Sequence, residues 1–228
     1  MLIGGFQKMT VLDYPGKIAC IIFTHGCNFK CPFCHNASLV IDEADLISQE
    51  EIFSYLNKRK GILDGVCISG GEPLLQKDIF DFMKRIKDMG FLVKLDTNGY
   101  LPDKLQYVIE NKLVDYVAMD IKNCKEKYSS TCNLIGLDIS KIEKSVEILM
   151  ESKVEYEFRT TVVKELHEIV DFIKIGEWIK GAKKYYIQSF VDSGNVIEKG
   201  LSSLDLQALN SILATVSPYV ECASLRGV

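Results

Sequence analysis

The sequence predicts an α/β fold, built as a partial (β/α)6 barrel that is similar to an incomplete TIM barrel. Short apolar runs alternate with longer amphipathic stretches along the 228 residues, and no linker or repeat divides them. This alternation indicates βαβ units around a parallel sheet. Polar motifs follow four successive strands, and ligands bind at that edge of the sheet in parallel α/β proteins.

Six short apolar runs are predicted to be the strands of this sheet, and a seventh near the C-terminus is a candidate edge strand. The predicted strands are Ile18–Thr24, Gly65–Ser69, Phe91–Asp96, Asp115–Asp120, Val154–Val163, Lys184–Phe190 and, at the edge, Tyr219–Ala223.

Between the strands, apolar residues recur with helical periodicity. The predicted helices are Ser48–Lys60, Lys77–Met89, Pro102–Asn111, Ser140–Ser152, Leu166–Lys180 and Ser203–Val216. Two of these helices begin with a capping-box pattern, formed by Ser48 with Glu51 and by Ser140 with Glu143.

Six such units fit either an open doubly wound sheet or a barrel, and periodicity alone is compatible with both. The placement of the polar residues favours the barrel. They follow the first four strands at Thr24–Cys27, Ser69–Pro73, Asp96–Gly99 and Met119–Lys122. Because these strand ends share one rim, we expect their polar residues to form a single site.

The composition is that of an ordinary globular protein, with 47% hydrophobic and 25% charged residues. The 27 basic and 31 acidic residues give a net charge of −4, and no basic run indicates a nucleic-acid or membrane surface. The N-terminus lacks the pattern of a signal peptide, so we expect a cytoplasmic protein. In a reducing compartment, closely spaced cysteines indicate metal or redox chemistry.

Three of the eight cysteines, Cys27, Cys31 and Cys34, lie close enough in sequence for their thiols to converge without closing a long loop. No fourth cysteine follows at a matching spacing. A structural metal site normally completes its own coordination, whereas a working site leaves a position open. The pattern therefore suggests an iron–sulfur cluster whose last iron is held for another ligand.

The other five cysteines are scattered along the chain. Cys20 and Cys67 lie in apolar runs and are predicted to be buried free thiols. The spacing of Cys124 and Cys132 matches no metal-binding pattern, and the sequence assigns no role to Cys222.

Two other metal sites fit the same segment. Cys31–His35 matches the haem-attachment motif, but haem is attached outside the cytoplasm and Cys27 would be unexplained. Zinc bound by the three cysteines with His35 or a distant thiol would make a closed site in a binding module. The Gly70–Pro73 turn at the next strand end weighs against zinc.

The rim residues beyond the cysteines suit a ligand with an amino group, a carboxylate and a ribose. Gly70 and Gly71 let the backbone approach a ligand closely. Asp96 and Asp120 offer acceptors for hydroxyls or a cation, and Lys122 offers positive charge for a carboxylate. Such a ligand could also fill the open iron.

The cysteine spacing, with Phe33 before the third cysteine and with Gly70–Pro73 downstream, resembles the radical S-adenosylmethionine (SAM) superfamily. The segments Asp13–Gly16 and Thr24–Asn36 are similar to the activating enzymes of glycyl radical enzymes. The resemblance is greatest to the activators of anaerobic ribonucleoside-triphosphate reductase. It covers nearly the whole chain and is densest from Asp13 to Lys122.

This resemblance implies a [4Fe–4S] cluster bound by Cys27, Cys31 and Cys34, with the amino and carboxylate groups of SAM on the fourth iron. Reductive cleavage of SAM would give methionine and a 5′-deoxyadenosyl radical, which removes a hydrogen atom from a glycine of the partner enzyme. The cofactors carry this chemistry, so no catalytic side chain beyond them is expected.

The resemblance also implies which residues bind SAM. Phe33 and His35 should border the adenine, the turn after the second strand should receive the amino group, and Lys122 should reach toward the carboxylate. Asp96 and Asp120 should face the ribose or a monovalent cation. The complete implied set is Phe33, Cys34, His35, Gly70, Gly71, Glu72, Pro73, Asp96, Thr97, Asn98, Asp120, Lys122, Arg159 and Gln188. Some relatives have a histidine at the position of Gln188.

We expect one radical SAM domain over residues 1–228, with a cluster loop at 25–36 and no accessory domain. The resemblance implies two partners. One is a glycyl radical enzyme, for which it favours anaerobic ribonucleotide reductase, and the other is a flavodoxin or ferredoxin that donates the electron. Two alternatives remain open. One is a radical SAM enzyme acting on a small molecule, as 7-carboxy-7-deazaguanine synthase does, and the other is a zinc-stabilised binding module without turnover.

Overall fold

The strands form one curved sheet, in which their spatial order follows their order in the chain. The computed structural model describes residues 1–41, 45–192 and 194–228. In these residues, β1 is antiparallel to β2, and β2 through β8 run parallel. The strands are β1 Ile3–Thr10, β2 Ala19–Thr24, β3 Gly65–Gly70, β4 Leu92–Thr97, β5 Tyr116–Asp120, β6 Glu155–Val162, β7 Tyr185–Ser189 and β8 Ala223–Arg226.

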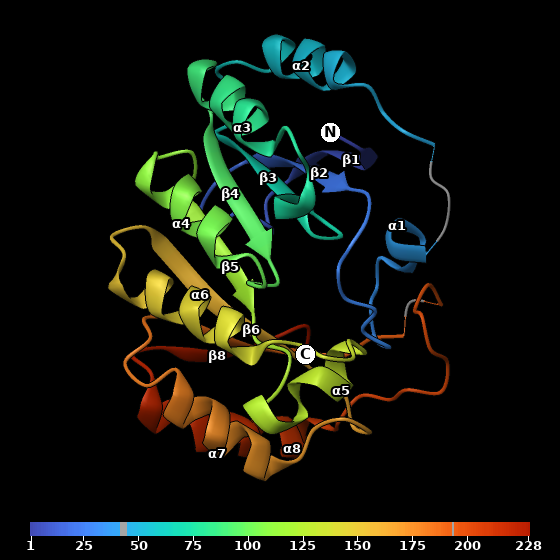
Figure 1. Ribbon diagram of the computed structural model, residues 1–228, viewed down its shortest axis with the longest axis vertical. Coiled ribbons are helices and arrows are strands. Elements are labelled where there is room, and N and C mark those ends of the chain that lie inside the picture. Colours follow the sequence, from blue (N-terminus) through green and yellow to red (C-terminus); the bar gives the residue numbers. More distant parts are fainter. Residues whose placement is uncertain (42–44, 193) are drawn as a thin grey trace.

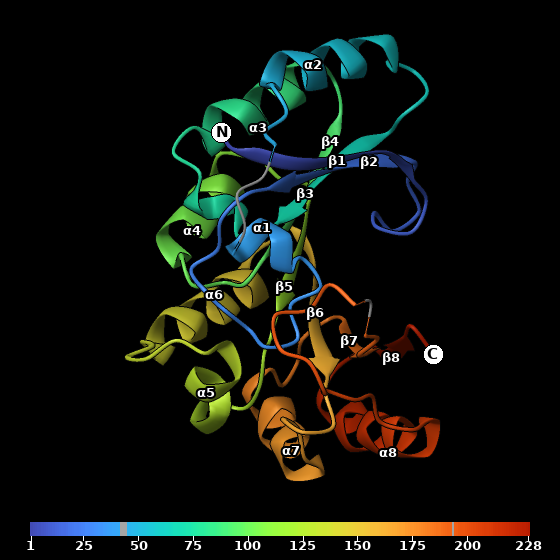
Figure 2. The same cartoon turned by 90° about the vertical axis from the view of Figure 1, so that its right-hand side faces the viewer.

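Most helices follow the outer face of the curved sheet, and α1 and α5 lie at the end where the parallel strands finish (Figure 1, Figure 2). The helices are α1 Ala37–Ile41, α2 Gln49–Lys58, α3 Ile79–Asp88, α4 Pro102–Glu110, α5 Tyr128–Cys132, α6 Ile139–Glu151, α7 Ile169–Trp178 and α8 Leu206–Val216. The described part of the chain contains no helix that is long and apolar enough to cross a membrane. The arrangement is the partial barrel that the sequence predicts.

Two hydrophobic clusters hold this barrel together, because alternate residues of a strand point to opposite faces. The larger cluster includes Val66, Leu95 and Phe82 and joins the sheet to the helices. The smaller one contains Tyr14, Cys67 and Tyr116. Tyr14 is buried, and its ring lies 3.0 Å from the place that a Cβ on Gly65 would occupy. The segment that carries Tyr14 therefore has a packing role.

The predicted strands and longer helices are present, but the short helices α1 and α5 were not predicted, and the edges of the sheet differ from the prediction. Strand β1 was not predicted, because Gly4 and Gly5 open it and polar residues interrupt its apolar pattern. The C-terminal edge strand begins at Ala223 rather than Tyr219, since Ser217–Tyr219 forms a 3-10 turn. Ser48 caps α2 as predicted. The predicted cap at Ser140 is wrong, because Asp138 caps α6 and accepts from the Ser140 N–H.

Glu72 fixes the ends of β3 and β4 to one another. Its side chain is fully buried and accepts hydrogen bonds from Leu74 N at 3.0 Å, Thr97 Oγ1 at 2.9 Å and Asn98 N at 2.7 Å. Its own N–H donates to Gly26 O at 2.9 Å. A single residue thus connects the cluster loop, the turn after β3 and the end of β4.

This position makes stability depend on pH. Burial raises the pKa of Glu72 from its ordinary value of 4.5 to about 7, although the donors around it favour the ionised form. Between these pH values the folded state holds a proton that the unfolded chain has released. Protonation of Glu72 therefore stabilises the folded state fully below pH 4.5, and this contribution is lost as the pH rises through about 7.

We predict that the free energy of unfolding of the wild type, relative to Glu72→Gln, falls by about 3 kcal/mol over this interval. Gln does not titrate, so it removes the dependence. Urea unfolding of both proteins at several pH values measures the difference. Glu177→Gln, an exposed position, is the matched control. Parallel pH profiles for the wild type and Glu72→Gln would contradict the assignment.

Candidate active site

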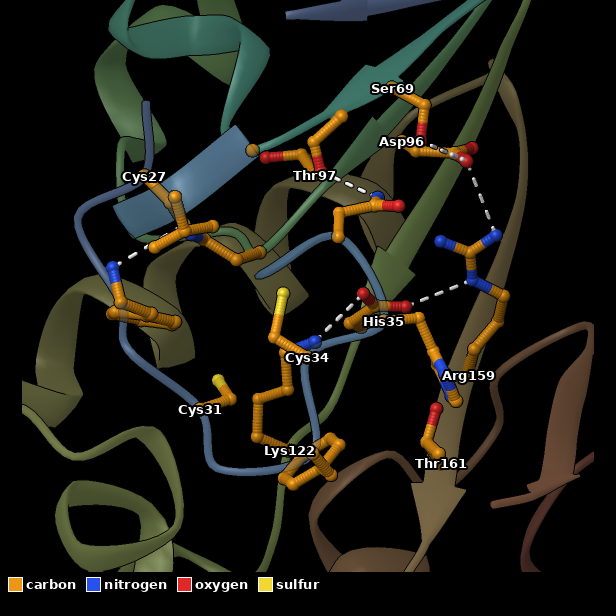
Figure 3. Close-up of a pocket in the computed structure, with 18 residues that line it drawn as sticks. Cys27, Cys31, Cys34, His35, Ser69, Asp96, Thr97, Lys122, Arg159 and Thr161 are labelled. Carbon is orange, nitrogen blue, oxygen red and sulfur yellow. Dashed lines mark hydrogen bonds and ion pairs between the residues drawn. The ribbon is translucent and has the colours of Figure 1, made fainter. Parts of the chain in front are cut away.

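A pocket of about 190 Å³ lies at the rim where the parallel strands end (Figure 3). Most of the predicted site residues line it, although they come from four strands, β3 to β6, and from the cluster loop after β2. These are Cys27, Cys31, Phe33, Cys34, His35, Gly70, Gly71, Asp96, Thr97, Asn98, Asp120, Lys122 and Arg159. The predicted single site on one rim is present.

Three predicted residues do not line the pocket. Glu72 is buried behind it in the junction described above, and Pro73 begins the short 3-10 helix Pro73–Leu75. Gln188 lies on β7, where it pairs with Thr161 of β6. Thr161 does line the pocket, so Gln188 is one strand away from the wall.

The cluster loop is held against the strand ends by close backbone contacts. Gly26 N donates to Leu39 O at 2.8 Å, and Asn36 Nδ2 donates to Gly70 O at 3.1 Å. A Cβ on Gly71 would lie 2.0 Å from Gly26 O, closer than any side chain tolerates. Glycine at position 71 is therefore required for the loop to sit where it does.

The three cysteines of the loop have different surroundings. Cys27 Sγ accepts from Phe29 N at 3.4 Å, and Asn98 Nδ2 lies 3.8 Å from the same sulfur. Burial raises the pKa of Cys27 to about 12 and also raises that of Cys34. The Cys132 thiol donates to Cys31 and holds the pKa of Cys31 below its ordinary value, despite burial.

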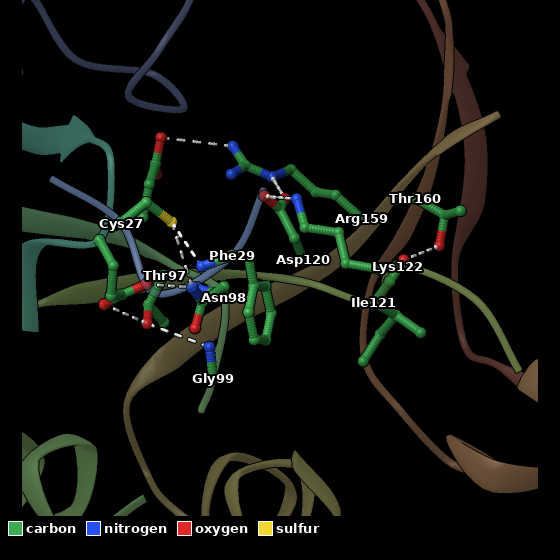
Figure 4. A network of polar contacts seen from close by, with 12 residues as sticks. Cys27, Phe29, Thr97, Asn98, Gly99, Asp120, Ile121, Lys122, Arg159 and Thr160 are labelled. Carbon is green, nitrogen blue, oxygen red and sulfur yellow. Dashed lines mark hydrogen bonds and ion pairs between the residues drawn. The ribbon is translucent and has the colours of Figure 1, made fainter. Parts of the chain in front are cut away.

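Asp96, Asp120 and Arg159 form the wall of the pocket that is made by the strand ends, with Asp96 labelled in Figure 3 and Asp120 in Figure 4. Asp120 contacts Lys122 Nζ at 2.9 Å and Arg159 Nε at 2.9 Å. Arg159 Nη1 also lies 3.5 Å from Asp96, which accepts from Ser69 Oγ at 3.1 Å. Although burial opposes ionisation, Arg159 and Lys122 hold the pKa of Asp120 at about 2.

Lys94 adds a third cation to this wall. It is only 2% exposed and forms an ion pair with Asp96, which lies two residues further along β4. Lys94, Lys122 and Arg159 together carry one more charge than Asp96 and Asp120. The wall therefore favours an anionic group, such as the carboxylate of an amino acid. A monovalent cation at Asp96 and Asp120 stays a prediction.

The pocket fits the cofactors that the sequence implies. Its donor set is three thiols on a short loop, which is the ligand chemistry of an iron–sulfur cluster. A bound zinc ion needs all of its ligands around one point. In the described part of the chain, no group of three His, Cys, Asp or Glu side chains is arranged to hold one metal ion.

Five lining residues were not predicted. Phe29 and Asn36 lie inside the cysteine segment, Ser69 and Thr161 lie at strand ends, and Val40 lies on α1. Their positions in or next to the predicted motifs were the sequence feature that could have assigned them to the pocket. The pairing of Cys132 with Cys31 had no such signal, because it joins residues far apart in the sequence.

The four cysteines away from the cluster loop and Cys132 are all free thiols. Cys20 and Cys67 are buried free thiols, as predicted. Cys124 Sγ lies 3.4 Å from the buried Asp171 carboxylate, away from the pocket. Cys222 is exposed.

Similar proteins identify the family. Residues 21–175 match the radical SAM superfamily. A Methanocaldococcus jannaschii protein, named as a candidate glycyl-radical enzyme activating enzyme, is 38% identical over 193 residues, which are 83% of this chain and 80% of that protein. The pyruvate formate-lyase-activating enzyme of Clostridium pasteurianum is 32% identical over 127 residues, or 53% of this chain and 52% of that enzyme.

A solved structure shares the fold. The structure of Streptococcus suis SuiB bound to S-adenosylmethionine superposes with a TM-score of 0.67 at 17% sequence identity, covering 89% of this chain and 48% of that chain. The family uses a [4Fe–4S] cluster and SAM, and its members are enzymes, so a zinc-stabilised module without turnover is not supported. The chain belongs to the radical SAM superfamily and, within it, to the glycyl-radical enzyme activating enzymes.

Proposed function

We propose that this protein generates a glycyl radical on a partner enzyme, and that the partner is an anaerobic ribonucleoside-triphosphate reductase. One observation carries the proposal: three thiols of one short loop share a pocket with a wall of charged strand-end residues. Thiols suit an iron–sulfur cluster, and the wall suits the amino acid and ribose groups of SAM. The motif resemblance supports the choice of the reductase.

In this proposal, Cys27, Cys31 and Cys34 hold three irons and leave the fourth open. The bound cluster and SAM together supply the reductive cleavage that yields a carbon-centred radical. The chain's own residues bind and orient these groups. The positive wall at Lys122 and Arg159 attracts the carboxylate, while the Asp96 and Asp120 carboxylates remain available as acceptors for hydroxyls.

The adenine is assigned to the cluster loop. Phe33 and His35 line the pocket, and the His35 ring stacks on Phe190 with centroids 5.5 Å apart. This contact holds the imidazole in place, leaving the backbone of residues 33–35 to border the base. Thr97, Asn98, Gly70 and Gly71 complete the proposed cradle, and Gln188 on β7 is a more distant candidate.

The partner's glycine segment needs a path into the barrel. In the described chain, β1 and β8 each pair with a single neighbouring strand, so the sheet does not close on itself. We propose that the segment enters through this opening. We further propose that residues 1–228 are one radical SAM domain and that the enzyme works in the cytoplasm, where thiols stay reduced.

The first test is an electron paramagnetic resonance spectrum of the anaerobically reconstituted, reduced protein, recorded with and without SAM. We expect a reduced-cluster signal that changes when SAM binds, because SAM occupies the open iron. Incubation with the reductase should then give a glycyl radical signal on the reductase. SAM cleavage on a small molecule without any protein partner would instead favour the alternative enzyme class.

Cys31→Ala should abolish cluster binding, because only two thiols would remain on the loop. Iron analysis after reconstitution measures this loss. Cys222→Ala, which removes an exposed thiol, should keep the wild-type iron content. A Cys31→Ala protein that still held about four irons would overturn the ligand assignment.

Lys122→Ala should weaken SAM binding about tenfold or more, since a charged hydrogen-bond donor to the carboxylate is lost. Its iron content should stay unchanged, because Lys122 holds no iron. Equilibrium binding of SAM and iron analysis on the same samples separate the two effects. Lys125→Ala, an exposed lysine nearby, is the control. Unchanged SAM affinity in Lys122→Ala would reject the assignment.

A further inference from the structure

The proposed function requires one electron to reach the cysteines, and the pocket is not the route by which a protein can deliver it. SAM and the partner's glycine segment both have to occupy the barrel interior. An electron carrier must therefore approach from outside the pocket. Outside the pocket, packed side chains connect the cluster loop to the surface.

That connection runs through Phe29 and Tyr100. Phe29 lies between Cys27 and Cys31 in the sequence, and its side chain is 2% exposed. Its ring centroid is 5.5 Å from that of Tyr100, which is half-buried at the end of the β4 motif. Tyr100 N also donates to Asn98 Oδ1 at 3.0 Å, and Asn98 contacts Cys27 Sγ. Packed side chains thus lead from Cys27 to the surface.

On its outer side, Tyr100 borders a second hollow, of about 420 Å³, between the starts of α4 and α6. Lys104, Lys141 and Lys144 line this hollow, with Asp103 as the one acid among its lining residues. Lys141 Nζ lies 4.8 Å from the Tyr100 ring centroid. This local excess of positive charge contrasts with the net charge of −4 of the whole chain.

An exposed apolar residue lies in the loop that leads into α6, whose first turn lines the same hollow. Ile135 is 99% exposed, in the loop between α5 and α6. One end of the loop is tied to the cluster loop, because Lys30 N donates to Cys132 O at 3.0 Å. The other end is tied to Tyr100, whose hydroxyl accepts from Asp138 N at 3.2 Å. Figure 2 shows α5 next to the cluster loop.

We propose that this side of the protein is the docking site of a small acidic one-electron carrier protein, and that Phe29 and Tyr100 lie on the route of the electron to Cys27. This inference rests on the proposed function. Each docking event oxidises the carrier by one electron and reduces the iron–sulfur centre by one electron, and no bond or proton is exchanged. The electron-entry surface consists of Tyr100, Ile135, Lys30, Lys104, Lys141 and Lys144.

The chemistry of the surface selects the partner. An apolar residue beside a rim of charge is typical of a transient protein interface. Lysines on the rim attract a carboxylate-rich protein and speed its association, and salt screens that attraction. Lys30 and Lys141 are exposed, so their charges are available to a partner.

Binding of oxidised flavodoxin to the reconstituted enzyme tests the proposal without relying on turnover. In Lys141→Glu/Lys144→Glu, we expect the Kd for flavodoxin to rise about tenfold at low salt. The control variant is Lys58→Glu/Lys60→Glu, which makes the same change of charge at the C-terminal end of α2. It should shift the Kd less than about twofold. The wild-type Kd should rise between about 50 mM and about 300 mM salt, and the variant should lose this dependence.

Ile135→Asp is the second variant. Because Ile135 is almost fully exposed, its replacement removes no packing from the core. We expect its flavodoxin affinity to fall severalfold, with an unchanged iron content. Wild-type affinity in both variants would overturn the proposal, as would an equal loss in the α2 control.

Reduction by titanium(III) citrate separates this proposal from the proposed function. A small reductant needs no docking site, so both variants should cleave SAM at the wild-type rate with it and more slowly with reduced flavodoxin. Slower cleavage with both reductants would place these residues in the catalytic machinery and reject the docking role. Absence of cleavage by the wild type with titanium(III) citrate would refute the proposed function itself.

Discussion

The contact between the cluster loop and the turn after β3 is the constraint on which the rest of the site depends. Gly71 leaves room for the Gly26 carbonyl, and the next residue, Glu72, hydrogen-bonds that carbonyl through its N–H. The Glu72 side chain then holds Thr97 and Asn98 at the end of β4. Three segments that each carry part of the site are thus fixed together by one residue, through its backbone N–H and its buried, hydrogen-bonded carboxylate.

Cationic side chains gather at two places in the molecule, one inside the barrel and one on its surface around Tyr100. Inside the barrel, two aspartates are enclosed by three cations, and the small excess of positive charge suits an anionic group of a ligand. Outside, lysines gather around Tyr100 on a chain that is acidic overall. Lys122 and Arg159 line one hollow, whereas Lys104, Lys141 and Lys144 line another, so the small ligand and an electron carrier would not compete for one surface.

The cluster loop contacts both of these places. Phe29 lines the pocket and also packs against Tyr100, and Cys34 and His35 line the pocket with Lys122. Cys132, the last residue of α5, lies next to Cys31, and its carbonyl accepts from Lys30 N, so α5 also supports the cluster loop. In a radical SAM enzyme this arrangement keeps the redox centre close to the surface while its reactive side opens into the barrel.

The sequence by itself determined the seven parallel strands to within a few residues, the gathering of three thiols on one short loop and the order of the rim motifs. These features depend on local periodicity and short spacings, which one segment contains in full. Tertiary structure alone decided that Glu72 is a buried junction, that Lys94 pairs with Asp96, and that Cys132 meets Cys31. It also placed Gln188 outside the pocket wall and added β1. Such contacts depend on how the sheet curves and on which distant segments pack together, and no local pattern encodes that.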